Sequence, residues 1–310
     1  MTNKRRRRAI ERGRASGRTD GARATAAANG RRRVVFGAAA FGAVVVVATA
    51  LLVIMRPGSA SAVPWSRLGT EDVHSLAFVG DDPNRLLFGH HGGILSSADG
   101  GQTWQPLGTR SDAMSLGPAA DGSIVIAGHN VFSESHDGGR TWQDIAAVLP
   151  SLDIHGFARD PGNPARMWAY LAIGGLWESL DGGRAWERVQ QENILFPVAV
   201  TSPSGTRLFG VTVAGLARSD DGGRTWLQVA TPELRPIASL AATADGSVLL
   251  AGGPDGLARS DDGGASWSSL PFEGQPFAIA VAAGGRTIAL VTRSTELFRS
   301  DDGGRTWPRP

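Results

Sequence analysis

The chain has 310 residues, no cysteine and a formal net charge of +2. The lack of cysteine excludes a disulfide framework, thiolate catalysis, iron–sulfur clusters and cysteine-ligated zinc. Its 42 glycines are about twice the usual share of roughly 7% and follow no G-X-Y period, which excludes collagen and places the excess in turns.

Charge is divided unevenly along the chain. Residues 1–33 carry twelve lysines and arginines but only two acidic side chains, Glu11 and Asp20. Residues 57–310 carry 27 acidic side chains against 18 arginines, so this part is acidic. A basic groove for nucleic acid is therefore not expected in the folded part of the protein.

An uncharged segment follows the basic tail. Residues 34–55 read VVFGAAAFGAVVVVATALLVIM, and a helix of this length spans about 33 Å, enough for a hydrocarbon core of about 30 Å. The flanking arginines predict a disordered cytoplasmic tail over residues 1–33, a single-pass signal anchor over 34–55 and a short linker over 56–63. The folded domain, residues 64–310, is then extracytoplasmic, and the cell membrane is its first expected partner.

A cleavable signal peptide is the alternative for the same segment. Ala60-Ser61-Ala62 is an A-x-A cleavage site, and cleavage near Ala62 would release a secreted domain. However, the apolar stretch is longer than the roughly 7–15 residues of a signal peptide, and the basic region before it is also long. The uncleaved anchor is therefore the favoured prediction.

One short segment recurs six times in the rest of the chain. Each copy has an Asp-Gly-Gly turn followed closely by a tryptophan, and these tryptophans are 38, 44, 40, 41 and 40 residues apart. A fixed period near 40 residues indicates a repeat architecture. The aspartates and tryptophans of the six copies are Asp99, Asp137, Asp181, Asp221, Asp262 and Asp302, and Trp104, Trp142, Trp186, Trp226, Trp267 and Trp307.

Each repeat fits four short strands, A to D, with turn-forming residues between A and B and the Asp-Gly-Gly turn between C and D. Four strands per unit predict an all-β fold, a six-bladed β-propeller of four-stranded antiparallel blades. The sequence WSRLG at residues 65–69 is similar to WQPLG at 104–108, where a strand D begins. We therefore expect residues 64–68 to complete the sixth blade and to remove its open edge.

The six segments resemble the Asp-box, S-x-D-x-G-x-T-W, of BNR-repeat, sialidase-like propellers. Proteins with this motif include sialidases, sortilin-type receptor domains and photosystem assembly factors, and the chain looks similar to short bacterial exported propellers loosely classed as glycosyl hydrolases. The resemblance implies the fold without choosing between an enzyme and a binding module. In an Asp-box the glycines supply positive φ and the carboxylate accepts bonds from its own turn, so the six aspartates and tryptophans are expected to be structural.

Alternating strand direction places the connections of a propeller on two faces. The A–B and C–D turns share one, here named the turn face, and the D–A and B–C loops share the other, the loop face. Five of the six histidines fall on the loop face of three adjacent blades. The candidate ligand-binding residues are Asp72, Asp112 and Asp153, and the candidate metal ligands are His74, His90, His91, Met114, His129 and His155.

These residue types are compatible with three kinds of ligand on the loop face: a metal ion, a glycan or a partner protein. Histidine with methionine suits copper, whereas histidine with aspartate suits zinc or another divalent ion. A glycan or a partner protein would use the same side chains as hydrogen-bonding groups. The sequence thus predicts a binding or assembly module, and capping of the loops by these histidines is the structural alternative.

A membrane-tethered, sialidase-like glycoside hydrolase is the other functional hypothesis. The resemblance implies a cluster of three arginines, a tyrosine nucleophile paired with a glutamate, and an aspartate acid. The only tyrosine, Tyr170, lies in a predicted strand, and no glutamate follows it closely. Catalytic residues therefore stay unassigned, and an enzyme is not the favoured expectation.

Overall fold

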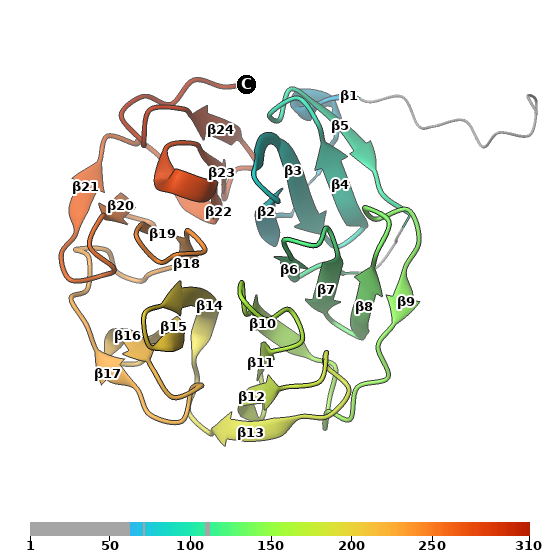
Figure 1. Cartoon of the computed structure of the whole chain (residues 1–310). Coiled ribbons are helices and arrows are strands. Elements are labelled where there is room, and N and C mark those ends of the chain that lie inside the picture. The colour runs from blue at the N-terminus through green and yellow to red at the C-terminus, as the bar shows by residue number, and fades with distance from the viewer. Residues whose placement is uncertain (1–62, 71, 109–111) are drawn as a thin grey trace, which may run out of the picture. The chain divides into compact units, whose positions relative to one another are not determined.

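The computed structural model describes residues 63–70, 72–108 and 112–310, and these form a ring of six β-sheets (Figure 1). The predicted tail, residues 1–33, and the predicted anchor, residues 34–55, lie outside the described residues. Within the described ranges, no helix is long and apolar enough to cross a membrane. The predicted all-β, six-bladed propeller is confirmed.

Each blade is an antiparallel sheet whose strands run in chain order from the inside of the ring outward (Figure 1). The first blade contains β2 (Ser75–Val79), β3 (Asp82–His90), β4 (Gly93–Ser97) and β5 (Thr103–Pro106). The second contains β6 (Ser115–Pro118), β7 (Ile124–Gly128), β8 (Val131–Ser135) and β9 (Gln143–Asp144). The third contains β10 (Ile154–Arg159), β11 (Met167–Leu171), β12 (Gly175–Ser179) and β13 (Glu187–Gln190).

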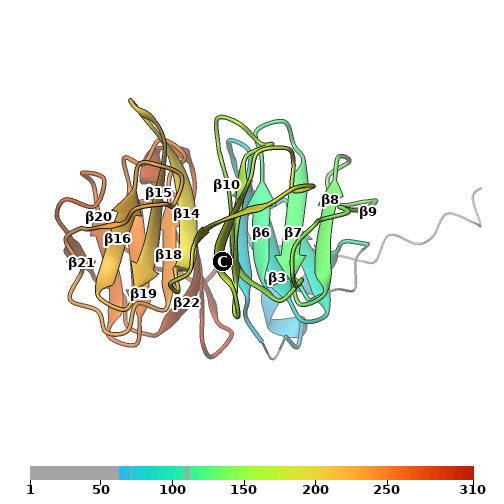
Figure 2. The ribbon, with the colours of Figure 1, turned by 90° about the horizontal axis from the view of Figure 1, so that it is seen from below.

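The second half of the ring repeats the pattern. The fourth blade contains β14 (Leu195–Ser202), β15 (Gly205–Thr212), β16 (Gly215–Ser219) and β17 (Leu227–Gln228). The fifth contains β18 (Ser239–Ala242), β19 (Leu249–Gly253), β20 (Gly256–Ser260) and β21 (Ser268–Leu270). The sixth contains β22 (Pro276–Val281), β23 (Ile288–Thr292) and β24 (Leu297–Ser300). Viewed along the plane of the ring, the strands run between its two faces (Figure 2).

The hydrophobic core is divided among the six blade interfaces. One cluster of buried apolar side chains lies between each pair of neighbouring blades, including the last and the first. Since every blade is covered on both sides, the strands in the middle of the sheets are buried along their whole length, as in β7, β11, β19 and β23. This explains why these segments are continuous apolar runs without the alternation of a half-exposed strand.

The prediction that residues 64–68 complete the sixth blade is wrong. Strand β1 (Val63–Pro64) pairs with β5, with Val63 opposite Trp104, and therefore adds a fifth strand to the first blade. The outer position of the sixth blade is taken by the residues that follow β24, where the Arg299 amide donates to the Pro308 carbonyl oxygen at 3.2 Å.

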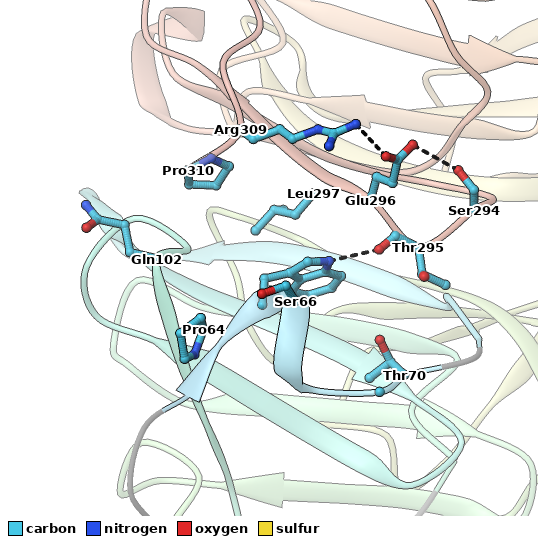
Figure 3. Close-up of a pocket in the computed structure, with 12 residues that line it drawn as sticks. Pro64, Ser66, Thr70, Gln102, Ser294, Thr295, Glu296, Leu297, Arg309 and Pro310 are labelled. Atoms are coloured by element: carbon cyan, nitrogen blue, oxygen red, sulfur yellow. Dashed lines mark hydrogen bonds and ion pairs between the residues drawn. The ribbon is translucent and has the colours of Figure 1, made fainter.

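Trp65 nevertheless joins the last blade to the first. It begins a short 3-10 turn (Trp65–Arg67), and its ring packs edge-on against Phe88 and Trp104 of the first blade. Its Nε1 donates to the carbonyl oxygen of Thr295, in the sixth blade, at 2.8 Å (Figure 3). A cleft of about 420 Å³ lies at this seam, bordered on the side of the sixth blade by Glu296 and Arg309. The ring is thus closed by the Trp65 side chain and by the apolar cluster between the sixth and first blades. The N-terminal strand β1 does not pair with the sixth blade.

Candidate functional site

In each Asp-Gly-Gly turn the aspartate carboxylate accepts hydrogen bonds from its own turn. In the first copy, the two carboxylate oxygens of Asp99 accept hydrogen bonds from the Thr103 amide at 2.9 Å and the Thr103 hydroxyl at 2.5 Å, and from Ser97 Oγ at 2.8 Å. Gly100 and Gly101 have φ of 76° and 100°, which explains the glycine pair. Trp104 Nε1 donates to the Gly101 carbonyl at 2.8 Å.

The same pattern recurs in the other five blades. Hydrogen bonds from Thr141 lower the pKa of Asp137 to about 2, and those from Ser266 do the same for Asp262. These carboxyl groups are therefore ionised at neutral pH and cannot donate a proton. One departure occurs at Trp267, whose Nε1 donates to the Ala230 carbonyl at 2.9 Å instead of to its own turn.

The loop face is organised by contacts between consecutive blades. The D–A loops that enter the second and third blades each run against the B–C loop of the blade before. The Ala113 amide donates to the His90 carbonyl at 3.3 Å, and the Asn130 amide donates to the Leu152 carbonyl at 2.9 Å. A Cβ at Gly128 would overlap the carbonyl oxygen of Asp112, so only glycine permits this approach. The loops that carry the candidate residues are thereby held close together.

Four side chains from the first and second blades meet at one point. His74 Nε2 lies 3.0 Å from Asp72 Oδ2, 3.3 Å from Asp112 Oδ1 and 2.8 Å from His91 Nδ1. His91 Nδ1 is itself 2.7 Å from Asp72 Oδ2, an oxygen that also accepts the His91 amide at 2.7 Å. Three loops therefore bring two imidazoles and two carboxylates close enough together to bind one ion.

Three further side chains meet beside them, from the second and third blades. His129 Nε2 lies 3.2 Å from His155 Nε2 and 3.4 Å from Asp153 Oδ1, and His155 Nε2 lies 3.0 Å from the same oxygen. The other imidazole nitrogen, His129 Nδ1, is 2.5 Å from Asp112 Oδ2. Asp112 thus contacts both groups, with Oδ1 nearest to His74 and Oδ2 nearest to His129.

Burial and hydrogen bonding set the charges of the first group. Burial lowers the pKa of His74, whose side chain is only 11% exposed, and so favours its neutral form. A hydrogen bond to Asp72 raises the pKa of His91. Burial alone would raise the pKa of Asp72, but hydrogen bonds from His91 outweigh it and hold this pKa below its usual value. Asp72 is therefore an anion with two imidazoles beside it.

Two of the candidate metal ligands lie apart from this meeting point. His90 stacks on Phe88 with ring centroids 5.9 Å apart, and its Nδ1 accepts the Gly92 amide at 3.1 Å, so it caps its own turn. Burial lowers its pKa. Met114 is half-buried and takes part in none of the contacts described above. We name the convergent set, Asp72, His74, His91, Asp112, His129, Asp153 and His155, the Asp/His cluster.

Similarity to known proteins agrees with the repeat and the fold. Residues 184–309 match the family described as photosynthesis system II assembly factor YCF48. YCF48 from Cyanidioschyzon merolae is 20% identical, with 81% of this chain and 87% of that chain covered and a TM-score of 0.51. The chain matches a BNR-repeat family over these residues, and its fold is a six-bladed β-propeller.

Two further solved structures share this fold. YCF48 bound to D1 peptide is 22% identical to this propeller, covering 80% of this chain and 83% of that chain, with a TM-score of 0.52. A GH74 xyloglucanase from Xanthomonas campestris is also 22% identical, with a TM-score of 0.50, but the match covers 74% of this chain and only 37% of that one. A comparison with curated protein sequences gives no match. At these identities the similarity establishes the propeller architecture.

The sequence does not reveal an apolar part of the loop face. Ile173 and Val213 occupy the B–C turns of the adjacent third and fourth blades and are 90% and 96% exposed. Leu195, at the start of β14, is also exposed. The sequence signal that could have indicated these exposed side chains is a large apolar residue inside a predicted turn. It occurs at Ala172-Ile173-Gly174 and at Val213-Ala214-Gly215. The turn face also exposes an apolar side chain, Leu180, within an Asp-Gly-Gly turn.

The residues expected of a sialidase are arranged differently in this propeller. Tyr170 is buried on β11, and burial raises its pKa. Glu178, on the neighbouring strand, is buried in an ion pair with Arg166 at 2.7 Å and a second with Arg224 at 2.9 Å. Its charge is thereby neutralised at the interface between the third and fourth blades, and it does not pair with the tyrosine.

Proposed function

We propose that this protein is a binding or assembly module that recognises a partner polypeptide through its loop face. The observation that carries the proposal is the exposure of Ile173 and Val213 at the tips of adjacent turns. Large apolar side chains displayed next to polar groups are typical of protein interaction sites, because they lose contact with water when a partner binds. The Asp/His cluster supplies the polar part of the same face.

The similar proteins support this proposal at the level of the fold. The matching family is described as an assembly factor, and YCF48 has been solved bound to D1 peptide. We propose the same general kind of activity for this chain, with a polypeptide as the ligand.

The partner is proposed to lie outside the cytoplasm. The apolar segment over residues 34–55 and the basic tail before it support a single-pass anchor with the propeller on the far side of the membrane. Because the chain has no cysteine, single introduced thiols report its topology cleanly. Ser204→Cys should react with a membrane-impermeant maleimide in intact cells, and Ser16→Cys only after permeabilisation. Labelling of Ser16→Cys in intact cells would contradict this topology.

Photocrosslinking tests the loop face as the partner-binding surface. A photoreactive amino acid placed at Ile173 or Val213 of the full chain in living cells should give one discrete adduct band. The matched control is the same residue at Leu180, which is exposed on the turn face. Equal adducts from both faces, or none from the loop face, would contradict the proposal.

Glycoside hydrolysis is the alternative function, and it has less support. Hydrolases of this kind need two carboxyl groups about 5 to 9.5 Å apart across a sugar, one of them free to act as an acid. The loop-face carboxylates Asp72, Asp112 and Asp153 are instead engaged by histidine nitrogens. The xyloglucanase shares the fold over about a third of its own length.

A further inference from the structure

We propose that the Asp/His cluster binds two divalent cations of the zinc class, at neighbouring sites coupled through Asp112. This inference does not depend on the identity of a partner polypeptide. The first site is formed by Asp72, His74, His91 and Asp112, and the second by His129, Asp153 and His155.

The distances within the cluster suit a tetrahedral cation. Ligand atoms bound at about 2.0 to 2.1 Å around zinc are roughly 3.3 Å from one another. In the second group, the three distances among His129 Nε2, Asp153 Oδ1 and His155 Nε2 are 3.2, 3.4 and 3.0 Å. In the first group, His74 Nε2 lies between 2.8 and 3.3 Å from the three other ligand atoms.

Hydrogen bonding alone does not satisfy the first site. An ionised carboxylate only accepts, so His91 Nδ1 must carry the proton that points to Asp72 Oδ2. The single proton on His74 Nε2 then faces Asp72 Oδ2, Asp112 Oδ1 and a protonated His91 nitrogen at once. A cation with three or four bonds would replace these conflicting contacts with direct ligation.

The second site is oriented by Asp112 in the way that metal-binding histidines usually are. His129 Nδ1 donates to Asp112 Oδ2 at 2.5 Å, which leaves a lone pair on Nε2 when the imidazole is neutral. That lone pair points at Asp153 and His155. A carboxylate that fixes the tautomer of a histidine ligand is a recurrent feature of metal sites.

Asp112 also supplies an independent sign of a missing partner. Its side chain is only 13% exposed, and within the described residues its Oδ1 is buried and accepts no hydrogen bond. A buried carboxylate oxygen without a donor is costly, and a cation would compensate it. Because Oδ1 faces the first site and Oδ2 holds His129 of the second, occupancy of the two sites should be coupled.

The donor set selects the class of metal. Imidazole nitrogens and carboxylate oxygens suit Zn²⁺ and similar first-row divalent cations, whereas Cu(I) prefers thiolate or thioether sulfur. The chain has no cysteine, and Met114 stands outside the cluster. This argues against a copper(I) site that uses Met114 as a ligand. The second site has three protein ligands, which leaves a tetrahedral position open for water or a partner's carboxylate.

Calorimetric titration of the full chain with Zn²⁺ tests the proposal. The protein, purified in detergent without a polyhistidine tag and stripped with chelator, should bind two equivalents. Asp72→Asn should abolish binding at the first site, and Asp153→Asn should abolish binding at the second site. Each variant should therefore bind one equivalent of Zn²⁺. Asp112→Asn should weaken both sites by about tenfold or more, because it removes a ligand of one and the orienting group of the other.

His136→Gln is the matched control, since His136 lies on the turn face, 3.2 Å from Glu134. It should bind two equivalents like the unmodified chain. Near-ultraviolet circular dichroism from the nine tryptophans should confirm that each variant is folded. Absence of Zn²⁺ binding to the folded chain would overturn the proposal in favour of hydrogen-bonded loop caps. One equivalent that both Asp72→Asn and Asp153→Asn abolish would overturn the two-site arrangement.

Discussion

The two faces of the ring carry aspartates in opposite chemical situations. On the turn face each Asp-box carboxylate is surrounded by the hydroxyl and amide donors of its own turn, and the arrangement recurs in every blade. On the loop face Asp72, Asp112 and Asp153 compete for the protons of a few imidazoles, and only three of the six blades contribute. Polar groups that are fully hydrogen-bonded within one repeat stabilise the fold. Polar groups that share too few protons between neighbouring blades are available to bind a ligand.

The largest expected effect concerns the structural side of this comparison. Trp104 is fully buried, packs against Phe88 and Trp65 and donates to Gly101. Trp104→Ala should lower the free energy of unfolding by about 3–5 kcal/mol. Trp267→Ala should lower the free energy of unfolding by less, because Trp267 is only half-buried and donates its hydrogen bond outside its own turn. Urea denaturation of both variants measures the difference, and equal losses would show that the six repeats are energetically equivalent.

A second prediction concerns a backbone contact within the loop face, between Gly128 and Asp112. Gly128→Ala should push away the loop that carries Asp112 and should weaken both Zn²⁺ sites by about tenfold or more, with a stability loss of about 1–3 kcal/mol. Gly162→Ala is the control, since its new Cβ would lie 3.6 Å from the nearest atom, Asp160 Oδ1. Zinc titration and urea denaturation of the pair measure both effects. Unchanged zinc binding in Gly128→Ala would argue against Asp112 as the link.

The pH dependence of the turn face gives a third prediction. Because the pKa of Asp137 is lowered from 3.8 to about 2, its contribution to stability is complete above pH 4 and is lost as the pH falls through about 2. Asp137→Asn should therefore have a lower Tm than the unmodified chain at pH 7, and the gap should close between pH 4 and pH 2. Thermal unfolding followed by tryptophan fluorescence measures it. A difference in Tm that persists at pH 2 would mean that the charge of the Asp137 carboxylate does not stabilise the fold.

The smallest expected effect on stability belongs to the apolar turns. Ile173→Ser and Val213→Ser should change the free energy of unfolding by less than about 0.5 kcal/mol, because both side chains are almost fully exposed. Each change should also abolish the adduct formed by a photoreactive amino acid at the other of the two positions. Chemical denaturation and the crosslinking yield are measured on the same variants. A large loss of stability would place these residues in the fold instead of in an interface.

The sequence predicted the architecture because the fold repeats itself. Six Asp-Gly-Gly turns at a period near 40 residues determine the number of blades, and the alternation of strand direction places the histidines on one face. This reasoning also selected Asp72, Asp112 and Asp153. It could not show that Asp112 lies between two groups of histidines, because that depends on how closely Gly128 lets consecutive loops approach.

Two features escaped prediction for identifiable reasons. The closure was misplaced because similarity between the segments at Trp65 and Trp104 says nothing about which sheet edge the first segment meets. His90 was grouped with the other loop-face histidines because it precedes His91, yet its ring turns back onto Phe88. Side-chain direction at the end of a strand depends on the adjacent turn, which a repeat period does not encode.

The seam at Trp65 has a consequence for the order in which the ring assembles. Five of the six blade interfaces join consecutive repeats, but the sixth joins residues at opposite ends of the domain, and Trp65 and Thr295 are 230 positions apart. Closing so long a loop costs more chain entropy than pairing consecutive repeats, so this contact should form last during folding and open first under stress. The propeller therefore has one built-in opening point, at the place where its first blade meets its last.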